Sequence, residues 1–230
     1  MNSETAQNKG LKEGSYVRLP VPLGEPDAFR YGATADILHL LIDNPAVGFT
    51  NRELHRVTGK GLGSVNAAVD ALEALGVITV DRSGRSNAVR IDPTMLVKAD
   101  DPITTIPQVE YHAPVRAILT ALEERVGDDV GVVLFGSVAR GTADRTSDID
   151  LFVVVEANRM QAQREAHAIE QEIADEEFDG DRYEAHIVVE PKGSAANHDR
   201  IDDILAEGLT LRDSQALDAV KQEVFKNGSE

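Results

Sequence analysis

The chain has 230 residues, of which 42% are hydrophobic and 27% are charged, and its formal net charge is −17. This is room for one large domain or for two small ones with separate cores. No apolar run approaches the roughly 20 residues that a membrane helix needs, so we expect a soluble globular protein with no membrane partner. Cysteine is absent, which excludes disulfides, thiolate zinc sites and thiol nucleophiles.

The first 30 residues are expected to form an extended or disordered arm. Residues 1–15 are polar and show no periodicity, and residues 16–30 contain three prolines. The opening residues lack the apolar stretch of a secretion signal and the Arg-rich pattern of a transit peptide. We therefore expect the protein to be cytoplasmic.

Residues 31–95 show the periodicity of a small helical domain. Apolar residues at helical spacing predict helices over 33–42, 50–59 and 65–75. Thr50 and Glu53 have the spacing of a capping box, which would begin the second helix. The runs VITVDR and NAVRI alternate like strands and are joined by SGRS, so they predict a hairpin.

This order of three helices and a hairpin resembles the winged helix-turn-helix of bacterial and archaeal regulators. The segment SVNAAVDALEALGVITVDRSGRSNAVRI is similar to their recognition helix and wing. We expect such a domain to contact DNA or structured RNA through the recognition helix and wing, with further basic side chains near phosphates. The expected base-side contacts are Ser64, Asn66, Arg82 and Arg85, and the expected phosphate contacts are Arg52, Arg56 and Lys60. A winged helix used for dimerisation, giving a homodimer, or for protein contact is the alternative.

Residues 96–111 carry two prolines and no clear period, so we expect a linker there. Residues 112–230 then alternate between strands and helices. The expected order is a helix at 114–125, a strand at 130–135, a short helical turn, a strand at DIDLFVVVE, a helix at 158–177, a strand at RYEAHIVVE, and two helical segments near 197–207 and 214–226.

Two aspartates and a Gly-Ser pair are the candidate chemical groups of this second half. Asp148 and Asp150 are two residues apart in an expected strand, so their carboxylates would share one face. Such a pair is suited to a hard cation such as Mg²⁺, although a strand that begins at the surface would explain it equally. Gly136 and Ser137 follow a buried strand, where a glycine allows close backbone approach and a hydroxyl can bind phosphate.

The stretch LFGSVARGTADRTSDIDLFVVV resembles the signature of the DNA polymerase β-like nucleotidyltransferase superfamily, and its minimal nucleotidyltransferase branch most closely. The resemblance covers residues 112–213 and includes ILAEGLTLRD, which is similar to a segment near the end of minimal domains. It implies an α+β fold in which a mixed sheet is flanked by helices. The residues that match the signature are Gly136, Ser137, Arg140, Gly141, Asp148 and Asp150.

The resemblance also implies an activity: transfer of an NMP from an NTP, with ATP as first candidate, to a hydroxyl acceptor. Two Mg²⁺ ions would be held by three carboxylates, and Gly136, Ser137 and Arg140 would hold the triphosphate. Glu184 is the expected third carboxylate, acting as metal ligand or general base. Glutamate where aspartate is commoner, and His186 on the same face, leave that assignment open, with Asp181 as a weaker candidate.

The acceptor is not identified by these residues. A protein, an RNA and a small molecule are all compatible with the resemblance, and related minimal domains often act on a partner protein in toxin-antitoxin-like pairs. The alternative function is a DNA-binding transcription regulator in which the second domain senses nucleotide or is inactive.

Charge divides the chain into two unequal parts. Residues 31–92 hold 6 basic and 7 acidic residues, a net of −1, whereas residues 112–230 hold 12 and 26, a net of −14. Only 7 residues of the whole chain are lysines. An acidic, lysine-poor surface with few aromatics resembles proteins of salt-loving organisms, in which salt screens the self-repulsion.

Overall fold

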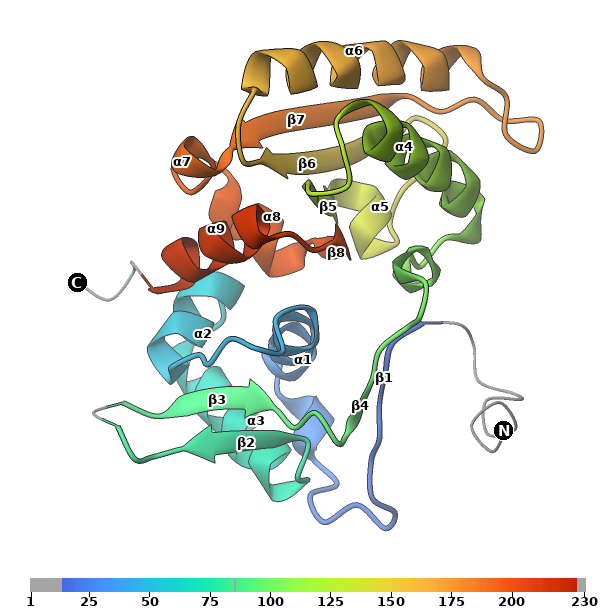
Figure 1. Ribbon diagram of the computed structural model, residues 1–230. Helices are drawn as coiled ribbons and strands as arrows, with labels where there is room; N and C mark the ends of the chain where they lie inside the picture. Colours follow the sequence, from blue (N-terminus) through green and yellow to red (C-terminus); the bar gives the residue numbers. More distant parts are fainter. Residues whose placement is uncertain (1–13, 85, 227–230) are drawn as a thin grey trace, which may run out of the picture.

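The computed structural model describes residues 14–84 and 86–226 (Figure 1). A four-stranded sheet in the order β7-β6-β5-β8 forms the centre of the C-terminal half. The parallel pair is β6 with β7, while β5 is antiparallel to both of its neighbours. The mixed sheet expected from the sequence is thus confirmed. The strands are β5 (Gly131–Phe135), β6 (Ile149–Val155), β7 (Ala185–Pro191) and β8 (Leu209–Arg212).

Helices cover both faces of this sheet. Alternate residues of β6 enter different hydrophobic clusters: Leu151 and Val153 face one way, Phe152 and Val154 the other. A strand buried on both faces explains its unbroken apolar run. None of the helices within residues 14–84 and 86–226 has the length and apolar character of a membrane span. The helices are α4 (His112–Arg125) and α6 (Arg159–Asp175) on one face, α8 (Ile201–Glu207) and α9 (Gln215–Lys226) on the other, and the short α5 (Gly136–Arg140) and α7 (Lys192–Ala195).

The N-terminal half contains three helices followed by an antiparallel hairpin, as expected from the sequence. The capping box is present: Glu53 N donates to Thr50 Oγ1 (3.1 Å), and Thr50 N donates to Glu53 Oε2 (2.6 Å). The elements expected of a winged helix are therefore in place, while the assignment to that class stays a prediction. They are α1 (Thr34–Asp43), α2 (Asn51–Thr58), α3 (Leu62–Ala74), β2 (Ile78–Asp81) and β3 (Ala88–Ile91).

The expected arm and the expected linker pair with each other. Strand β1 (Tyr16–Val17) is antiparallel to β4 (Leu96–Val97). These elements are too short to show a period in the sequence, which explains why neither was predicted. The first 13 residues, where disorder was predicted, lie outside the described residues. The described residues also include the 3₁₀ helices η1 (Ala28–Arg30), η2 (Pro102–Thr105) and η3 (Val109–Tyr111).

One hydrophobic cluster runs through both halves. It contains the buried side chains of α1, α2 and α3 together with Val133, Phe135 and Phe152 of the sheet. At the centre of the junction, the rings of Phe49 and Phe225 meet edge to face, with centroids 4.9 Å apart. The N-terminal half is therefore packed directly on α8 and α9, as Figure 1 shows.

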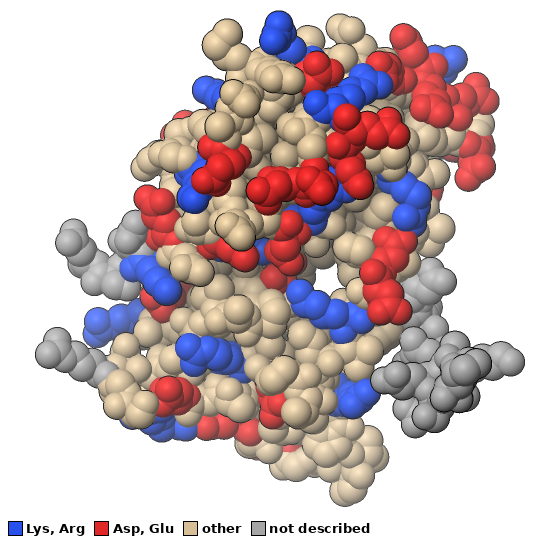
Figure 2. All heavy atoms as spheres, in the orientation of Figure 1, with Lys and Arg blue, Asp and Glu red and all other residues tan. Residues whose placement is uncertain are grey.

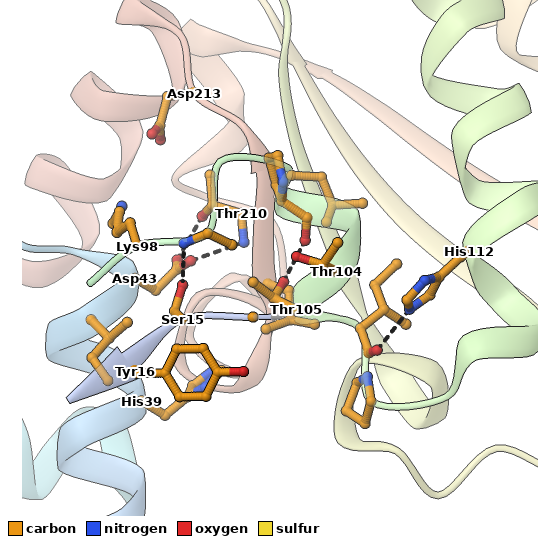
Figure 3. Close-up of a pocket in the computed structure, with 18 of the residues that line it drawn as sticks. Ser15, Tyr16, His39, Asp43, Lys98, Thr104, Thr105, His112, Thr210 and Asp213 are labelled. Atoms are coloured by element: carbon orange, nitrogen blue, oxygen red, sulfur yellow. Dashed lines mark hydrogen bonds between the residues drawn. The ribbon is translucent and has the colours of Figure 1, made fainter. Parts of the chain in front are cut away.

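A buried polar network crosses the same junction at the outer edge of β8. Thr210 N and Thr210 Oγ1 donate to the two carboxylate oxygens of Asp43 (2.9 and 2.6 Å), and Lys221 Nζ donates to Thr210 Oγ1 (2.8 Å). Figure 3 shows Asp43 and Thr210 facing each other. The Lys221 side chain is only 4% exposed and that of Asp43 16%. The lysine charge is therefore balanced inside the protein.

Replacing Lys221 with Met should lower the free energy of unfolding by about 3 kcal/mol, because it leaves the Asp43 carboxylate nearly buried without its cation. Chemical denaturation measures this loss. Lys226→Met, an exposed position on the same helix, is the matched control and should change stability by less than about 0.5 kcal/mol. The double variant Asp43→Asn, Lys221→Met should recover much of the loss, and a double variant as unstable as Lys221→Met would contradict this interpretation.

Candidate functional site

The candidate site lies where β5 ends and β6 begins. Phe135 and Asp150 are register partners on these two antiparallel strands, so the chain that follows Phe135 starts beside Asp150. Gly136 has a φ of +76°, in the left-handed region that glycine tolerates. A Cβ atom at Gly136 would collide with Asp150 Oδ2. Because Gly136 has no side chain, its backbone can lie directly against the Asp150 carboxylate.

The Asp150 carboxylate is half-buried, and its electrostatic surroundings are mixed. Burial raises the pKa of this group above its ordinary value, and the negative charge of Asp148 adds to that rise. His186, when protonated, and the positive charges of Arg200 and Arg140 act in the opposite direction on the pKa of Asp150. A cation bound at Asp150 would therefore offset the free-energy cost of keeping this half-buried carboxylate ionised.

Asp148 lies in the loop just before β6, not within the strand as predicted. Hydrogen bonds within the loop hold the chain ahead of it. Asp144 Oδ1 accepts from Thr146 N (2.9 Å) and Ser147 Oγ (3.2 Å), and the first of these bonds is the main reason that the pKa of Asp144 is lowered. Asp148 itself is exposed. The loop thus presents Asp148 to solvent next to the half-buried Asp150.

Two residues of the expected linker also fix this loop. Gln108 Nε2 donates to Ala143 O, and Ala143 N donates to Gln108 Oε1, both at 3.0 Å. Tyr111 Oη donates to Asp144 O (3.0 Å). Sequence reasoning missed these contacts because a single glutamine in an aperiodic segment carries no signal.

Glu184, the expected third carboxylate, lies one residue before β7 and outside the strand in which it was predicted. Its carbonyl oxygen accepts from Ile149 N (2.9 Å), so its backbone lies alongside the start of β6. On the β7 side, the register partner of Asp150 is His186. Across residues 14–84 and 86–226, no three His, Asp or Glu side chains are gathered closely enough to hold a metal ion. The role of Glu184 stays a prediction.

Arg140, the cation expected at the phosphates, and a second arginine near α5 are engaged in different ways. Arg140 Nη1 forms an exposed ion pair with Glu207 Oε2 (3.1 Å), which joins α5 to the end of α8. Arg200, which sequence reasoning missed, lies with Cζ 5.7 Å from the ring centroid of Phe135. No motif could have indicated it, because Arg200 belongs to a turn whose position depends on how α8 packs. Ser137 is half-buried in the first turn of α5.

The residues expected to contact nucleic acid are mostly engaged within the protein. Arg82 forms a two-pronged ion pair with Glu73, and Asn66 Oδ1 accepts from Asn51 Nδ2 (2.8 Å). Arg85 lies outside the described residues. Ser64 is half-exposed on α3. These contacts neutralise the wing charge at Arg82, and nucleic-acid binding stays a prediction.

Two of the three expected phosphate contacts are likewise paired inside the chain. Arg56 Nη1 donates to Asp202 Oδ1 (2.6 Å) and its Nη2 to Val224 O (2.9 Å), so this side chain holds α2 against α8 and α9. The Arg56 side chain is thus directed toward α8 and α9, whereas we expected it to lie near phosphates. Lys60 is paired with Asp36 (2.9 Å), and Arg52 is exposed.

A cavity of about 930 Å³ lies elsewhere, between β1, α1, the linker and β8 (Figure 3). Several of its polar groups are bonded to protein: Ser15 Oγ accepts from Ala99 N (3.1 Å), and His112 Nε2 lies 3.0 Å from Ile106 O. A second cavity of about 810 Å³ adjoins Asp148 and Glu184. We place the candidate site at the aspartates, because chemistry depends on the charged groups more than on cavity size.

Comparison with known proteins agrees with this placement. Residues 115–210 match the family model of the nucleotidyltransferase domain. The match includes β5, α5, the loop before β6 and both aspartates, and it supports membership of this segment in the polymerase β-like superfamily. The search of curated proteins found no match to the chain.

Replacing Gly136 with Ala should lower the free energy of unfolding by at least about 1 kcal/mol, because alanine is strained at a φ of +76° and its Cβ would displace the Asp150 carboxylate. Gly193→Ala in α7 is the matched control, since a Cβ there meets no atom within 4 Å. Equal stability of both variants in urea denaturation would refute the close approach.

Replacing Asp150 with Asn should raise the unfolding temperature of the metal-free protein at neutral pH. Because burial raises the pKa of Asp150 above 3.8, ionisation costs more in the folded state than in the unfolded state, and a neutral amide avoids that cost. Below the unfolded pKa both states are protonated, so the difference should vanish there, grow between the unfolded and the raised folded pKa, and stay constant at higher pH. Thermal unfolding in a chelator, with the exposed Asp129→Asn as control, measures it; an Asp150→Asn variant less stable than wild type at neutral pH contradicts it.

Proposed function

We propose that this protein is an Mg²⁺-dependent nucleotidyltransferase that transfers an NMP from an NTP, ATP being the first candidate, to a hydroxyl acceptor. The observation that carries the proposal is the close approach of Asp150 to the bare backbone at Gly136, next to Asp148, within a segment that matches the nucleotidyltransferase domain. In such a transfer the acceptor oxygen bonds to the α-phosphorus, the bond between the α- and β-phosphates breaks, and pyrophosphate leaves.

The donor set suits a hard divalent cation. Asp148 and Asp150 offer carboxylate oxygens, which Mg²⁺ prefers, and Mg²⁺ commonly takes its other ligands from water and substrate phosphates. Two protein carboxylates are therefore sufficient to bind one Mg²⁺ ion together with water and substrate phosphates. When bound, the metal would neutralise charge on the attacking and leaving oxygens. Glu184 would join the set as ligand or base by turning its side chain toward Asp148.

The phosphates would lie over the first turn of α5. The half-buried Ser137 hydroxyl is available there, and Gly136 adds no side chain of its own. Arg140 would reach the triphosphate by exchanging its exposed ion pair with Glu207 for a phosphate oxygen. An exposed ion pair of this kind is worth little, so the exchange is favourable.

The acceptor would enter from the cavity of about 810 Å³ beside Asp148 and Glu184. This cavity is also lined by Arg145, Arg182 and Tyr183, so it offers charged and aromatic groups to a polar acceptor. A protein hydroxyl, an RNA end and a small molecule each fit this description, as does a partner protein in a toxin-antitoxin-like pair. The alternative of a DNA-binding regulator gains no support from the N-terminal surface, where Arg56 and Arg82 are paired within the chain.

Asp148→Asn and Asp150→Asn should each lower NMP transfer by at least roughly 100-fold, because metal binding supplies several kcal/mol of charge stabilisation. Incubation with Mg²⁺, each α-labelled NTP and a cell extract measures transfer as label in protein or RNA. Asp129→Asn, an exposed acid before β5, is the matched control. Full transfer by either aspartate variant, or equal transfer without Mg²⁺, would contradict the proposal.

A further inference from the structure

Arg200 is a cation held at the candidate site by packing. Its guanidinium lies over the ring of Phe135, the residue that precedes Gly136. Phe135 and Asp150 are register partners on adjacent strands, so their side chains lie on the same face of the sheet. The two contacts therefore place this guanidinium on the face of the sheet that carries Asp150, next to the residue that precedes α5.

Arg200 has no carboxylate partner, unlike three other basic residues of this half. Arg140 is paired with Glu207, Arg159 with Glu190, and Lys192 with Glu156. Within the described chain, the guanidinium of Arg200 forms no ion pair within 4.0 Å, although residues 112–230 carry 26 acidic side chains. An unpaired arginine on so acidic a half is a charge that remains available to a ligand.

The structural roles of Arg200 do not account for its position. It precedes the first residue of α8, and the positive end of a helix dipole disfavours a cation there. Its contact with Phe135 is an exposed cation–π interaction, which a neutral apolar residue could replace by packing. An apolar residue could not supply the planar set of N–H donors with which a guanidinium binds an anion.

We infer that Arg200 binds the β- or γ-phosphate of the NTP, on the side of Asp150 formed by Phe135 and α8. This inference rests on the proposed function and adds a residue from the C-terminal helices to the phosphate site. Guanidinium groups bind phosphate through two parallel N–H donors, and a triphosphate carries more negative charge than one Mg²⁺ neutralises. The AMP portion of the nucleotide would not contact Arg200, because the negative charge that the metal leaves unneutralised is on the β- and γ-phosphates.

Calorimetric titration of the full chain with ATP, ADP and AMP in the presence of Mg²⁺, at fixed ionic strength, tests this. For Arg200→Ala the ATP dissociation constant should rise about 10- to 100-fold, the loss expected for a charged hydrogen bond to phosphate. The AMP constant should change by less than about threefold. Arg200→Gln keeps the length of the side chain and should show the same loss, and Arg200→Lys should recover part of the affinity.

Arg164→Ala is the matched control, because Arg164 is exposed on α6, on the other face of the sheet, and has no ion pair among the described residues. It removes the same charge and should leave all three constants unchanged. Thermal unfolding of each variant establishes that it is folded.

The outcomes separate the inference from the proposed function. Wild-type protein that binds none of ATP, GTP, CTP and UTP with Mg²⁺ would overturn the proposed function, and the role of Arg200 with it. Folded Arg200→Ala and Arg200→Gln variants that bind ATP as tightly as the wild type would overturn only the role of Arg200. Equal losses for ATP and AMP would also overturn it, since the contact would then not be to the outer phosphates.

Discussion

The candidate site depends on one close approach, that of the Asp150 carboxylate to the backbone at Gly136. The register of β5 and β6 brings the two residues together, and the left-handed backbone at Gly136 turns the chain directly into α5. The same packing half-buries Asp150, which raises its pKa. The pairing of β5 with β6, the turn at Gly136 and the ionisation of Asp150 therefore depend on one another.

The rest of the molecule supports this arrangement from two sides. Gln108, from the segment between the halves, holds the loop that leads to Asp148. On the other side, the N-terminal half packs against α8 and α9 and ties them down through Arg56, while Asp43 and Lys221 fix the edge of β8. Arg200 and Glu207 are at the two ends of α8, so the helix that packs against the N-terminal half also carries Arg200 and the partner of Arg140.

Surface charge follows the same division. On the face shown in Figure 2, acidic side chains are concentrated over the half that contains the four-stranded sheet. That half has a net charge of −14, which would repel nucleotides and nucleic acids at a distance. The triphosphate binding that we propose would therefore depend on short-range contacts with a metal ion and with local arginines, and salt would assist it by screening the repulsion.

Much of this could be predicted from the sequence, because the signals were local. The apolar run of β6, the capping box at Thr50 and the Gly-Ser followed by paired aspartates each lie within one short stretch of the sequence. The contacts of Gln108, Arg56 and Arg200 join residues that are distant in the chain, and no periodicity marks them. Strand β8 was missed for a related reason: its four residues lie between two helices, and its pairing with β5 depends on tertiary packing.

A crystal structure of the protein with Mg²⁺ and a non-hydrolysable NTP analogue tests the central claim most directly. The account predicts a metal ion about 2.0–2.1 Å from a carboxylate oxygen of each of Asp148 and Asp150, with triphosphate oxygens completing its coordination over α5. A triphosphate seated in the junction cavity of Figure 3, or a metal ion bound without either aspartate, would contradict the account.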